Sequence, residues 1–287
     1  MDHSGKNEYA ERERSMNALM KSILDTPCPS GAAVCWWLGQ MGLMVKLEGM
    51  LLCVDYFATD TPSRRFPPPI PAGEVEGVDV FLGTHDHSDH IDHPAWRIWA
   101  KTCPDARFVF PAAHMRHVMD DGTRPGNCIG LNDMECCRTG GITVRAAAAA
   151  HEFLSRDPET GLYPCLQYVI EGGGVRIYHA GDTLRYDGML AKIRSFGPVD
   201  AALVPINGRD AKRYKRNCIG NMTFQEAVDL TGELRPRCVI PGHWDMFKDN
   251  PGDPDAFADY LDAKYPGQVR CLRPARCEPF RIGAGSD

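Results

Sequence analysis

The densest run of chemically capable side chains is residues 84–93, which read THDHSDHIDH. Within six residues the run brings together three imidazoles and a carboxylate, from His85, His87, Asp89 and His90. Histidines spaced i, i+2 in an extended segment point to one side, and a turn after them lets Asp89 and His90 face a second point. Neutral imidazole and carboxylate are ligands for zinc, manganese and iron. The run therefore predicts a centre for one or two metal ions rather than a solvated turn.

Three further candidate ligands lie later in the chain, each at or just past the end of an expected strand. His151 ends the run GITVRAAAAAHEF, Asp182 lies in HAGDT, and His243 follows VIPG. Side chains that follow strand ends gather at one rim of a sheet, where ligands bind. The candidate metal ligands are therefore His85, His87, Asp89, His90, His151, Asp182 and His243. Four further histidines are interpreted as packing, surface or supporting residues: His93, His114, His117 and His179.

Short apolar runs bounded by turns predict the strands that must position these groups. Strands are expected over residues 34–38, 42–47, 50–56, 78–82, 107–109, 142–151, 166–171, 175–180, 201–205 and 238–240, with one more at the end of the chain. The alanine run favours a helix by propensity. It follows two glycines and three β-branched residues, so a strand is predicted there.

Helices are expected over residues 7–24, 94–101, 112–120, 190–196, 223–232 and 254–264. Asp92 precedes a proline as a helix cap, and Thr223 with Glu226 forms the pattern of a capping box. The chain shows no internal repeat and no linker, so residues 1–287 are expected to form one domain. Strands in each half, with helices between them, predict an α/β fold of two packed sheets flanked by helices.

Two loops and one strand end leave alternatives open. The proline-rich loop 59–77 fits an active-site rim or a surface excursion. The loop after residue 205 carries Asn207, Arg209 and further basic residues, which fit anchors for an anionic substrate or a solvated face. Asp55 fits either a carboxylate that orients a metal ligand or a strand-end cap.

Composition narrows the class of protein. Hydrophobic residues make up 43% of the 287, enough for a full core. The net charge of -6 argues against general binding to nucleic acid or anionic membranes. The twelve cysteines form no CxxC pairs, and the first thirty residues lack the apolar stretch of a signal peptide. We therefore expect a cytoplasmic protein without a membrane span.

The string HxHxDH, with the later His151, Asp182 and His243, resembles the metallo-β-lactamase superfamily of hydrolases. The resemblance implies an αββα four-layer sandwich with the site at the rim between the sheets. It further implies that one metal is bound by His85, His87 and His151, a second by Asp89, His90 and His243, and that Asp182 bridges them. Flavodiiron oxidoreductases carry Glu at the position of His87, so hydrolysis is favoured over redox chemistry. Secreted lactamases lack the equivalent of Asp182, so antibiotic degradation is not expected.

A closer resemblance is to the L-ascorbate-6-phosphate lactonase group within that superfamily. It rests on VCWWLGQMGLMVKLEG, CVDYF, THDHSDHID, YHAGDT, NMTFQEA and VIPGHWDMF. Such lactonases are cytoplasmic, manganese-dependent and oligomeric, and they open a phosphorylated sugar lactone. The resemblance implies substrate contacts from Asn207 and Arg209, and Asn221 is a weaker candidate at a helix start. It also implies a homo-oligomer with a small anionic sugar-like substrate.

The chemistry expected is attack of a metal-bound hydroxide on the lactone carbonyl, because metal ions lower the pKa of bound water from 15.7 toward ~7. Two divalent ions are expected, with manganese favoured and zinc or iron as alternatives. Asp182 and Asp89 are the candidate catalytic residues, Asp89 as carrier of the proton to the leaving oxygen. No GxSxG elbow is present, which disfavours an acyl-enzyme. The alternatives are a metal-dependent phosphodiesterase or nuclease and a metal-binding protein without turnover.

Overall fold

The computed structural model describes residues 17–283 of the chain. The helix expected over residues 7–24 falls partly outside this range, and its described part is α2, Ala18–Asp25. The side chain of Asn17 caps α2 by accepting from the backbone amides of Leu19 and Met20. Buried Met20 and Ile23 hold α2 against the rest of the molecule.

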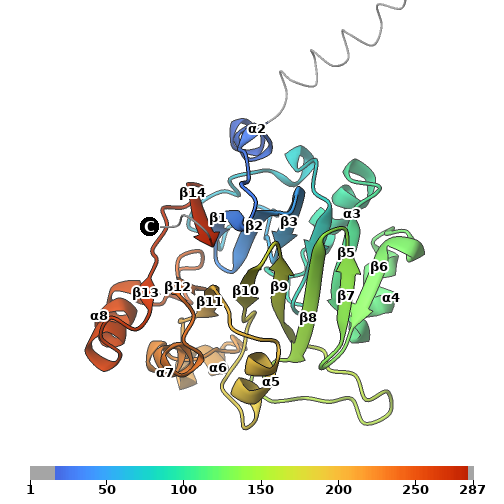
Figure 1. Cartoon of the computed structure of the whole chain (residues 1–287). Coiled ribbons are helices and arrows are strands. Elements are labelled where there is room, and N and C mark those ends of the chain that lie inside the picture. Colours follow the sequence, from blue (N-terminus) through green and yellow to red (C-terminus); the bar gives the residue numbers. More distant parts are fainter. Residues whose placement is uncertain (1–16, 284–287) are drawn as a thin grey trace, which may run out of the picture.

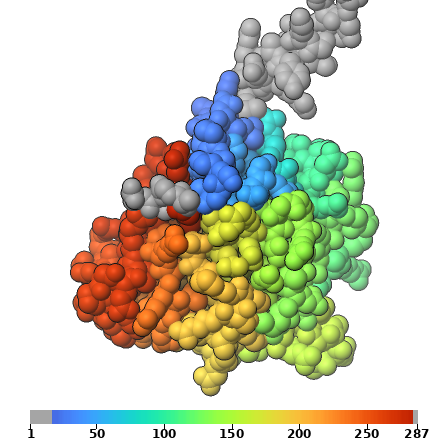
Figure 2. Space-filling model, in the orientation of Figure 1, coloured from blue at the N-terminus to red at the C-terminus, as the bar shows by residue number. Residues whose placement is uncertain are grey.

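Two seven-stranded sheets lie face to face at the centre of the molecule (Figure 1). The first has the order β14 (Pro279–Gly283), β1 (Ala32–Gly39), β2 (Gly42–Leu47), β3 (Met50–Val54), β4 (Val80–Leu82), β5 (Arg107–Pro111) and β6 (Cys128–Leu131). The second has the order β13 (Arg270–Cys271), β12 (Cys238–Gly242), β11 (Ala201–Pro205), β10 (Val175–His179), β9 (Leu166–Gly172), β8 (Ile142–Ala148) and β7 (Cys136–Thr139). In the space-filling view the two halves of the chain pack side by side (Figure 2).

Helices cover the outer face of each sheet. On the first sheet, α2, α3 (His93–Thr102) and α4 (Met115–Asp120) pack against residues such as Trp36 and Phe81. On the second sheet, α5 (Met189–Ser195), α7 (Phe224–Leu234) and α8 (Pro254–Lys264) pack against residues such as Tyr178 and Val204. This is the predicted four-layer α/β sandwich, which the structure confirms. None of the described helices has the length and apolar character needed to cross a bilayer.

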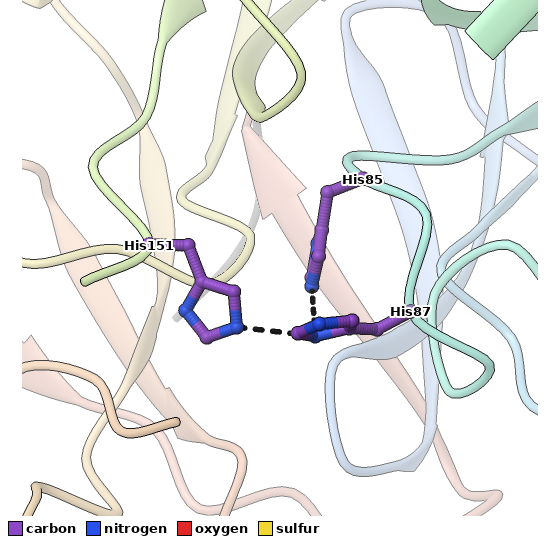
Figure 3. Close-up of side chains that lie close together, drawn as sticks. All are labelled: His85, His87 and His151. Atoms are coloured by element: carbon purple, nitrogen blue, oxygen red, sulfur yellow. Dashed lines mark hydrogen bonds between the residues drawn. The ribbon is translucent and has the colours of Figure 1, made fainter. Parts of the chain in front are cut away.

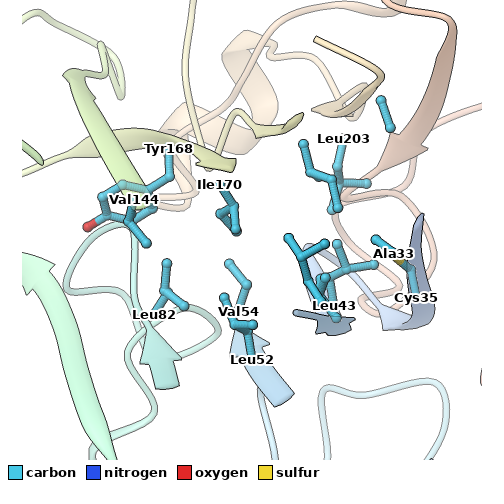
Figure 4. Packing of buried hydrophobic residues seen from close by; sticks show 14 of the residues in the cluster. Ala33, Cys35, Leu43, Leu52, Val54, Leu82, Val144, Tyr168, Ile170 and Leu203 are labelled. Atoms are coloured by element: carbon cyan, nitrogen blue, oxygen red, sulfur yellow. The ribbon is translucent and has the colours of Figure 1, made fainter. Parts of the chain in front are cut away.

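The central strands are apolar on both faces because each face is covered. In β1, Ala33, Cys35 and Trp37 pack between the sheets. The alternate residues of the same strand, Val34 and Trp36, pack under the helices. Figure 4 shows the inner layer, where residues such as Leu82 and Val54 of the first sheet meet Val144 and Ile170 of the second.

Some elements differ from the prediction. The alanine run is a strand as expected, but β8 ends at Ala148, and only isolated bridges continue to His151. The strands β6 and β7 were not predicted. The four-residue β6, Cys-Ile-Gly-Leu, contains a glycine and is too short for a clear pattern, and the half-exposed β7, Cys-Cys-Arg-Thr, does not alternate apolar and polar residues. The basic loop contains a short helix, α6 (Ala211–Lys215).

The directions of the strands decide where the site forms. In the first sheet β1, β3 and β4 run the same way, since β2 is antiparallel to both β1 and β3 and β4 is parallel to β3. In the second sheet β8, β10, β11 and β12 likewise run together. The carboxyl ends of these seven strands therefore lie at one edge of each sheet, where the candidate ligands follow them.

Candidate metal centre

The first group of imidazoles joins the loop after β4 to the end of the β8 segment. His87 Nδ1 lies 3.0 Å from His85 Nε2 and 3.1 Å from His151 Nε2, so the three rings converge on one point (Figure 3). His85 is buried, His151 is half-buried and His87 is exposed at the mouth of the site. The geometry therefore brings together the three residues that the resemblance assigns to the first metal.

The second group consists of Asp89, His90 and His243. Asp89 Oδ2 lies 3.7 Å from His90 Nε2 and 3.6 Å from His243 Nε2. Asp182 stands between the two groups. Its Oδ1 is 3.3 Å from His90 Nε2, and its Oδ2 is 3.1 Å from His243 Nε2 and 3.7 Å from His151 Nε2. All seven candidate ligands thus meet in one place, with the Asp182 carboxylate in reach of both groups.

The residues present fit divalent metal ions. Buried polar atoms are ordinarily hydrogen-bonded. Here His90 Nε2 and Asp182 Oδ1 are buried and make no hydrogen bond of good geometry, although they face each other. Imidazole nitrogen and carboxylate oxygen are ligands that divalent first-row ions take up readily. His85, His87 and His151 would hold one ion, and Asp89, His90 and His243 another.

The electrostatics of the two groups differ. Burial lowers the pKa of His85 well below its usual value and that of His151 to about 4, so both imidazoles are neutral and ready to bind metal. Burial also opposes the charge on His90 and His243, but the carboxylates of Asp182 and Asp89 outweigh it. They raise the pKa of His243 to about 9 and that of His90 well above its usual value. A metal ion bound by the second group would therefore have to displace protons from these rings.

Asp55 fixes the ring of His90 from behind. Its Oδ2 lies 2.7 Å from His90 Nδ1, and its carboxylate accepts from the backbone amide and the hydroxyl of Thr84 at 2.8 and 2.6 Å. Thr84 in turn packs against Gly181, where a Cβ would come within 2.8 Å of Thr84 Cβ. Of the two readings of Asp55, the geometry favours the carboxylate that orients a metal ligand.

Gln40 is a site residue that the sequence reasoning missed. It lies in the β1–β2 turn with a φ of 55°, and its Nε2 is 3.0 Å from Asp89 Oδ2 and 3.1 Å from His243 Nε2. The backbone carbonyl of Gln40 accepts from the backbone amide of His243 at 3.0 Å, and the backbone amide of Gln40 donates to Asp245 Oδ1 at 2.8 Å. The only signal in the sequence was a polar residue inside an otherwise apolar turn, GQMG, which does not reveal its contacts.

The three predicted substrate-binding residues line neither cavity that contains the candidate metal ligands, and Asn207 and Arg209 line a separate cavity of about 410 Å³. Arg209 pairs with Glu226 through two hydrogen bonds of 2.6 and 2.8 Å and donates to the Asn221 carbonyl at 3.1 Å. Asn221 and Asn207 are buried and linked at 3.1 Å, and Asn207 Nδ2 donates to Asn250 Oδ1 at 2.9 Å. Their direct contact with substrate stays a prediction, and the structure gives them a supporting role.

The site opens into two cavities that share His87, His151 and Ile219. One cavity, of about 460 Å³, is lined by Asp89, Asp182, His243, Ser63, Asn217 and Asn250, among others. The other, of about 220 Å³, is lined by His85, Asp86, His114, Phe153 and Cys165, among others. Because Ser63 belongs to the proline-rich loop, that loop contributes to the rim of the site.

An αββα sandwich with histidines and aspartates gathered at the strand ends defines a metal-dependent hydrolase of the metallo-β-lactamase type. The family profile described as Beta-lactamase superfamily domain matches residues 53–244, and the chain belongs to the metallo-β-lactamase superfamily. The resemblance to this superfamily, stated from the sequence, is thereby confirmed.

Similar proteins agree with this assignment. A UPF0173 metal-dependent hydrolase from Caldivirga maquilingensis is 30% identical over 240 residues, which are 83% of this chain and 94% of the relative. A protein named probable L-ascorbate-6-phosphate lactonase UlaG, from Salmonella choleraesuis, is 24% identical over 78% of this chain and 73% of its own. The solved structure of Igni18, a metallo hydrolase from Ignicoccus hospitalis, matches the fold with a TM-score of 0.67 and 22% identity, covering 87% of this chain and 98% of that one.

Proposed function

We propose that this metal-dependent hydrolase is a lactonase that opens a phosphorylated sugar lactone with two divalent ions, manganese favoured. The observation that carries the two-ion proposal is the position of the Asp182 carboxylate, with oxygens 3.3 Å from His90 Nε2 and 3.7 Å from His151 Nε2. A carboxylate in reach of both ligand groups suits a bridging ligand. The similarity to a protein named as an ascorbate-phosphate lactonase supports the substrate class.

When bound, the ions would supply a nucleophilic water of lowered pKa and positive charge for the oxyanion. The residues of the chain provide the rest. Asp89 lines the larger cavity, and the positive charge of His90 and the hydrogen bond with His243 overcome burial and lower its pKa. A bound cation would favour the ionised carboxylate in the same way. An ionised carboxylate beside the reacting carbonyl can take a proton and pass it to the leaving oxygen.

The larger cavity suits a hydroxylated substrate. Ser63, Ser88, Asn217 and Asn250 offer neutral polar groups around Asp89. No lysine or arginine of residues 17–283 lines this cavity. We place the phosphate at its edge, where Asn217 follows the basic segment that ends in Arg216, whose side chain is exposed. The homo-oligomer expected from the resemblance belongs to the same proposal, and light scattering of the purified protein tests it.

The experiment is a pH-indicator assay of metal-replete protein on free and phosphorylated sugar lactones. We expect turnover of a phosphorylated lactone. Asp182→Ala should lose at least 1,000-fold in kcat, about 4 kcal/mol of barrier, together with bound metal. Asp187→Ala, an exposed acid nearby, is the matched control. Cleavage of bis(p-nitrophenyl) phosphate without any lactone turnover would replace the lactonase by a phosphodiesterase, and full activity of Asp182→Ala would refute the bridging role.

A further inference from the structure

Three histidine side chains gather beside the proposed centre, around the carboxylate of Asp86. His93 begins α3, His114 ends a short 3-10 helix (Ala112–His114), and His117 lies in α4. The sequence suggested that these histidines serve packing or the surface. The structure instead brings their rings from three elements to one carboxylate, so that interpretation is incomplete.

The ligand atoms of Asp86, His93 and His117 are close enough for one ion, and His114 Nδ1 lies beside them. Asp86 Oδ1 lies 2.6 Å from His93 Nε2, and Asp86 Oδ2 lies 2.8 Å from His117 Nδ1 and 3.7 Å from His114 Nδ1. The atoms of Asp86, His93 and His117 all lie within 4.8 Å of one another. A tetrahedral zinc ion with bonds of about 2.1 Å holds its ligand atoms about 3.4 Å apart. Small side-chain shifts thus convert this group into a coordination shell.

The outer nitrogens of two rings are already engaged. His93 Nδ1 is hydrogen-bonded to the buried carboxylate of Asp121, which Arg97 Nε holds at 2.9 Å. His114 Nε2 donates to the carbonyl of Pro164 at 2.7 Å. Metal-binding histidines usually donate their far N–H to a carboxylate or a backbone carbonyl, which fixes the tautomer and turns the other nitrogen toward the ion. Both rings show this arrangement, with the other nitrogen facing Asp86.

A hydrogen-bonded network without metal accounts for the contacts of Asp86 with His93 and His117, but not for the orientation of His114. Protonation of His93 would satisfy its contact with Asp86. It would not account for the approach of His114 Nδ1, which is 3.7 Å from the carboxylate, too long for a hydrogen bond, while its other nitrogen carries the proton. A cation between the carboxylate and the three imidazoles satisfies every one of these atoms.

We propose that Asp86, His93, His114 and His117 form a further metal site for a zinc-like divalent ion. Three imidazoles and one carboxylate fill a tetrahedral shell, which is the closed arrangement of structural zinc sites. Asp86 lies between His85 and His87 in the chain. An ion here would therefore fasten the ligand loop to α3 and α4, beside the smaller cavity that Asp86 and His114 also line.

Metal counting tests this site independently of any lactone assay. Full-length protein is stripped with a chelator, reloaded with Zn²⁺, freed of excess ion and measured by plasma mass spectrometry. His117→Gln and His93→Gln should each bind one zinc per chain less than the wild type. Arg116→Gln, an exposed neighbour on α4, should match the wild type. The same loss of one zinc is expected in the Asp182→Ala background, where the other centre is depleted.

Two results would overturn the site. One is a wild-type zinc content in both histidine variants. The other is a loss in His117→Gln alone, which would leave only adventitious binding by a histidine whose side chain is 53% exposed. Cobalt loading provides a readout of geometry, because the difference spectrum between wild type and His117→Gln should contain the visible bands of tetrahedral Co²⁺. Circular dichroism serves as the check that His117→Gln, at an exposed position, is folded.

Discussion

At the scale of single residues, the site is built on unusual backbone positions. Gln40, Asp55 and His243 have φ values of 55°, 45° and 58°, in the left-handed region that residues other than glycine rarely adopt. Each lies just past the end of β1, β3 or β12 and contacts a member of the second ligand group. Such conformations persist where the surroundings over-determine them, and they cluster at functional sites.

Gln40→Ala should weaken catalysis without unfolding the protein. The amide holds Asp89 and His243 at 3.0 and 3.1 Å, so its loss lets two ligand side chains reorient. We expect a tenfold lower kcat, about 1.4 kcal/mol, with KM changed less than twofold. Steady-state kinetics at saturating metal measure this. The exposed Gln225→Ala is the control, and an unchanged kcat in Gln40→Ala would show that the turn serves the fold alone.

At the scale of elements, α7 begins with a capping box between Thr223 and Glu226, as the sequence predicted. The same Glu226 carboxylate pairs with Arg209, so the basic loop is tied to the helix that follows it. One carboxylate thus serves both as a cap and as a partner for a guanidinium. The dual role explains why Arg209 points to α7 in the structure.

Arg209→Gln should destabilise the protein in a pH-dependent way. The hydrogen bonds from Arg209 lower the pKa of Glu226 below its ordinary 4.5, so the pair stabilises the fold above that pH. The contribution is lost as the pH falls through the lowered value, when Glu226 takes up a proton. Because the pair is partly exposed, we expect about 0.5–1 kcal/mol at pH 7. Urea unfolding at pH 7 and pH 3.5 measures the difference between variant and wild type.

The same variant decides whether Arg209 contacts substrate. If Arg209 has only a structural role, the substitution leaves KM unchanged. If Arg209 binds the substrate, the substitution raises KM tenfold or more. Arg237→Gln, whose exposed side chain lies near Asp200, is the control for loss of a positive charge. Equal stability of Arg209→Gln and wild type at pH 7 would contradict the pairing seen here.

At the scale of the whole molecule, the metal centre joins the two sheets. The loop after β4 comes from the first sheet, whereas His151, Asp182 and His243 come from the second. Ions shared by these groups bind only the folded chain. Their binding free energy therefore adds to the stability of the sandwich.

Metal removal should lower the melting temperature, and the effect should shrink in acid. Metal at 1,000 times its Kd adds about 4 kcal/mol, or roughly 10 °C or less for a chain of this size. Since Asp182 and Asp89 raise the pKa of His243 to about 9, protons compete with metal below that pH, and more strongly as the pH falls. Calorimetry of chelated and reloaded protein at pH 8 and pH 6 measures this. A shift that grows toward pH 6 would contradict the competition.

The sequence by itself determined the fold class and the side chains that gather at the candidate centre. Strand periodicity, turn residues and caps are local signals, and His85, His151, Asp182 and His243 follow strands that such signals reveal. Because the carboxyl ends of parallel strands share an edge, the ligands could be expected to meet. The weakly patterned edge strands β6 and β7 carried no such signal.

Only the tertiary structure decided the pairings between distant elements. Local patterns do not encode that Gln40 reaches Asp89, that Arg209 turns to Glu226, or that His114 and His117 close on Asp86. These contacts join residues 17 to 49 positions apart, and they depend on how helices and loops pack over the sheets. Packing is a property of the assembled layers, so these side chains acquire their roles only when the sandwich forms.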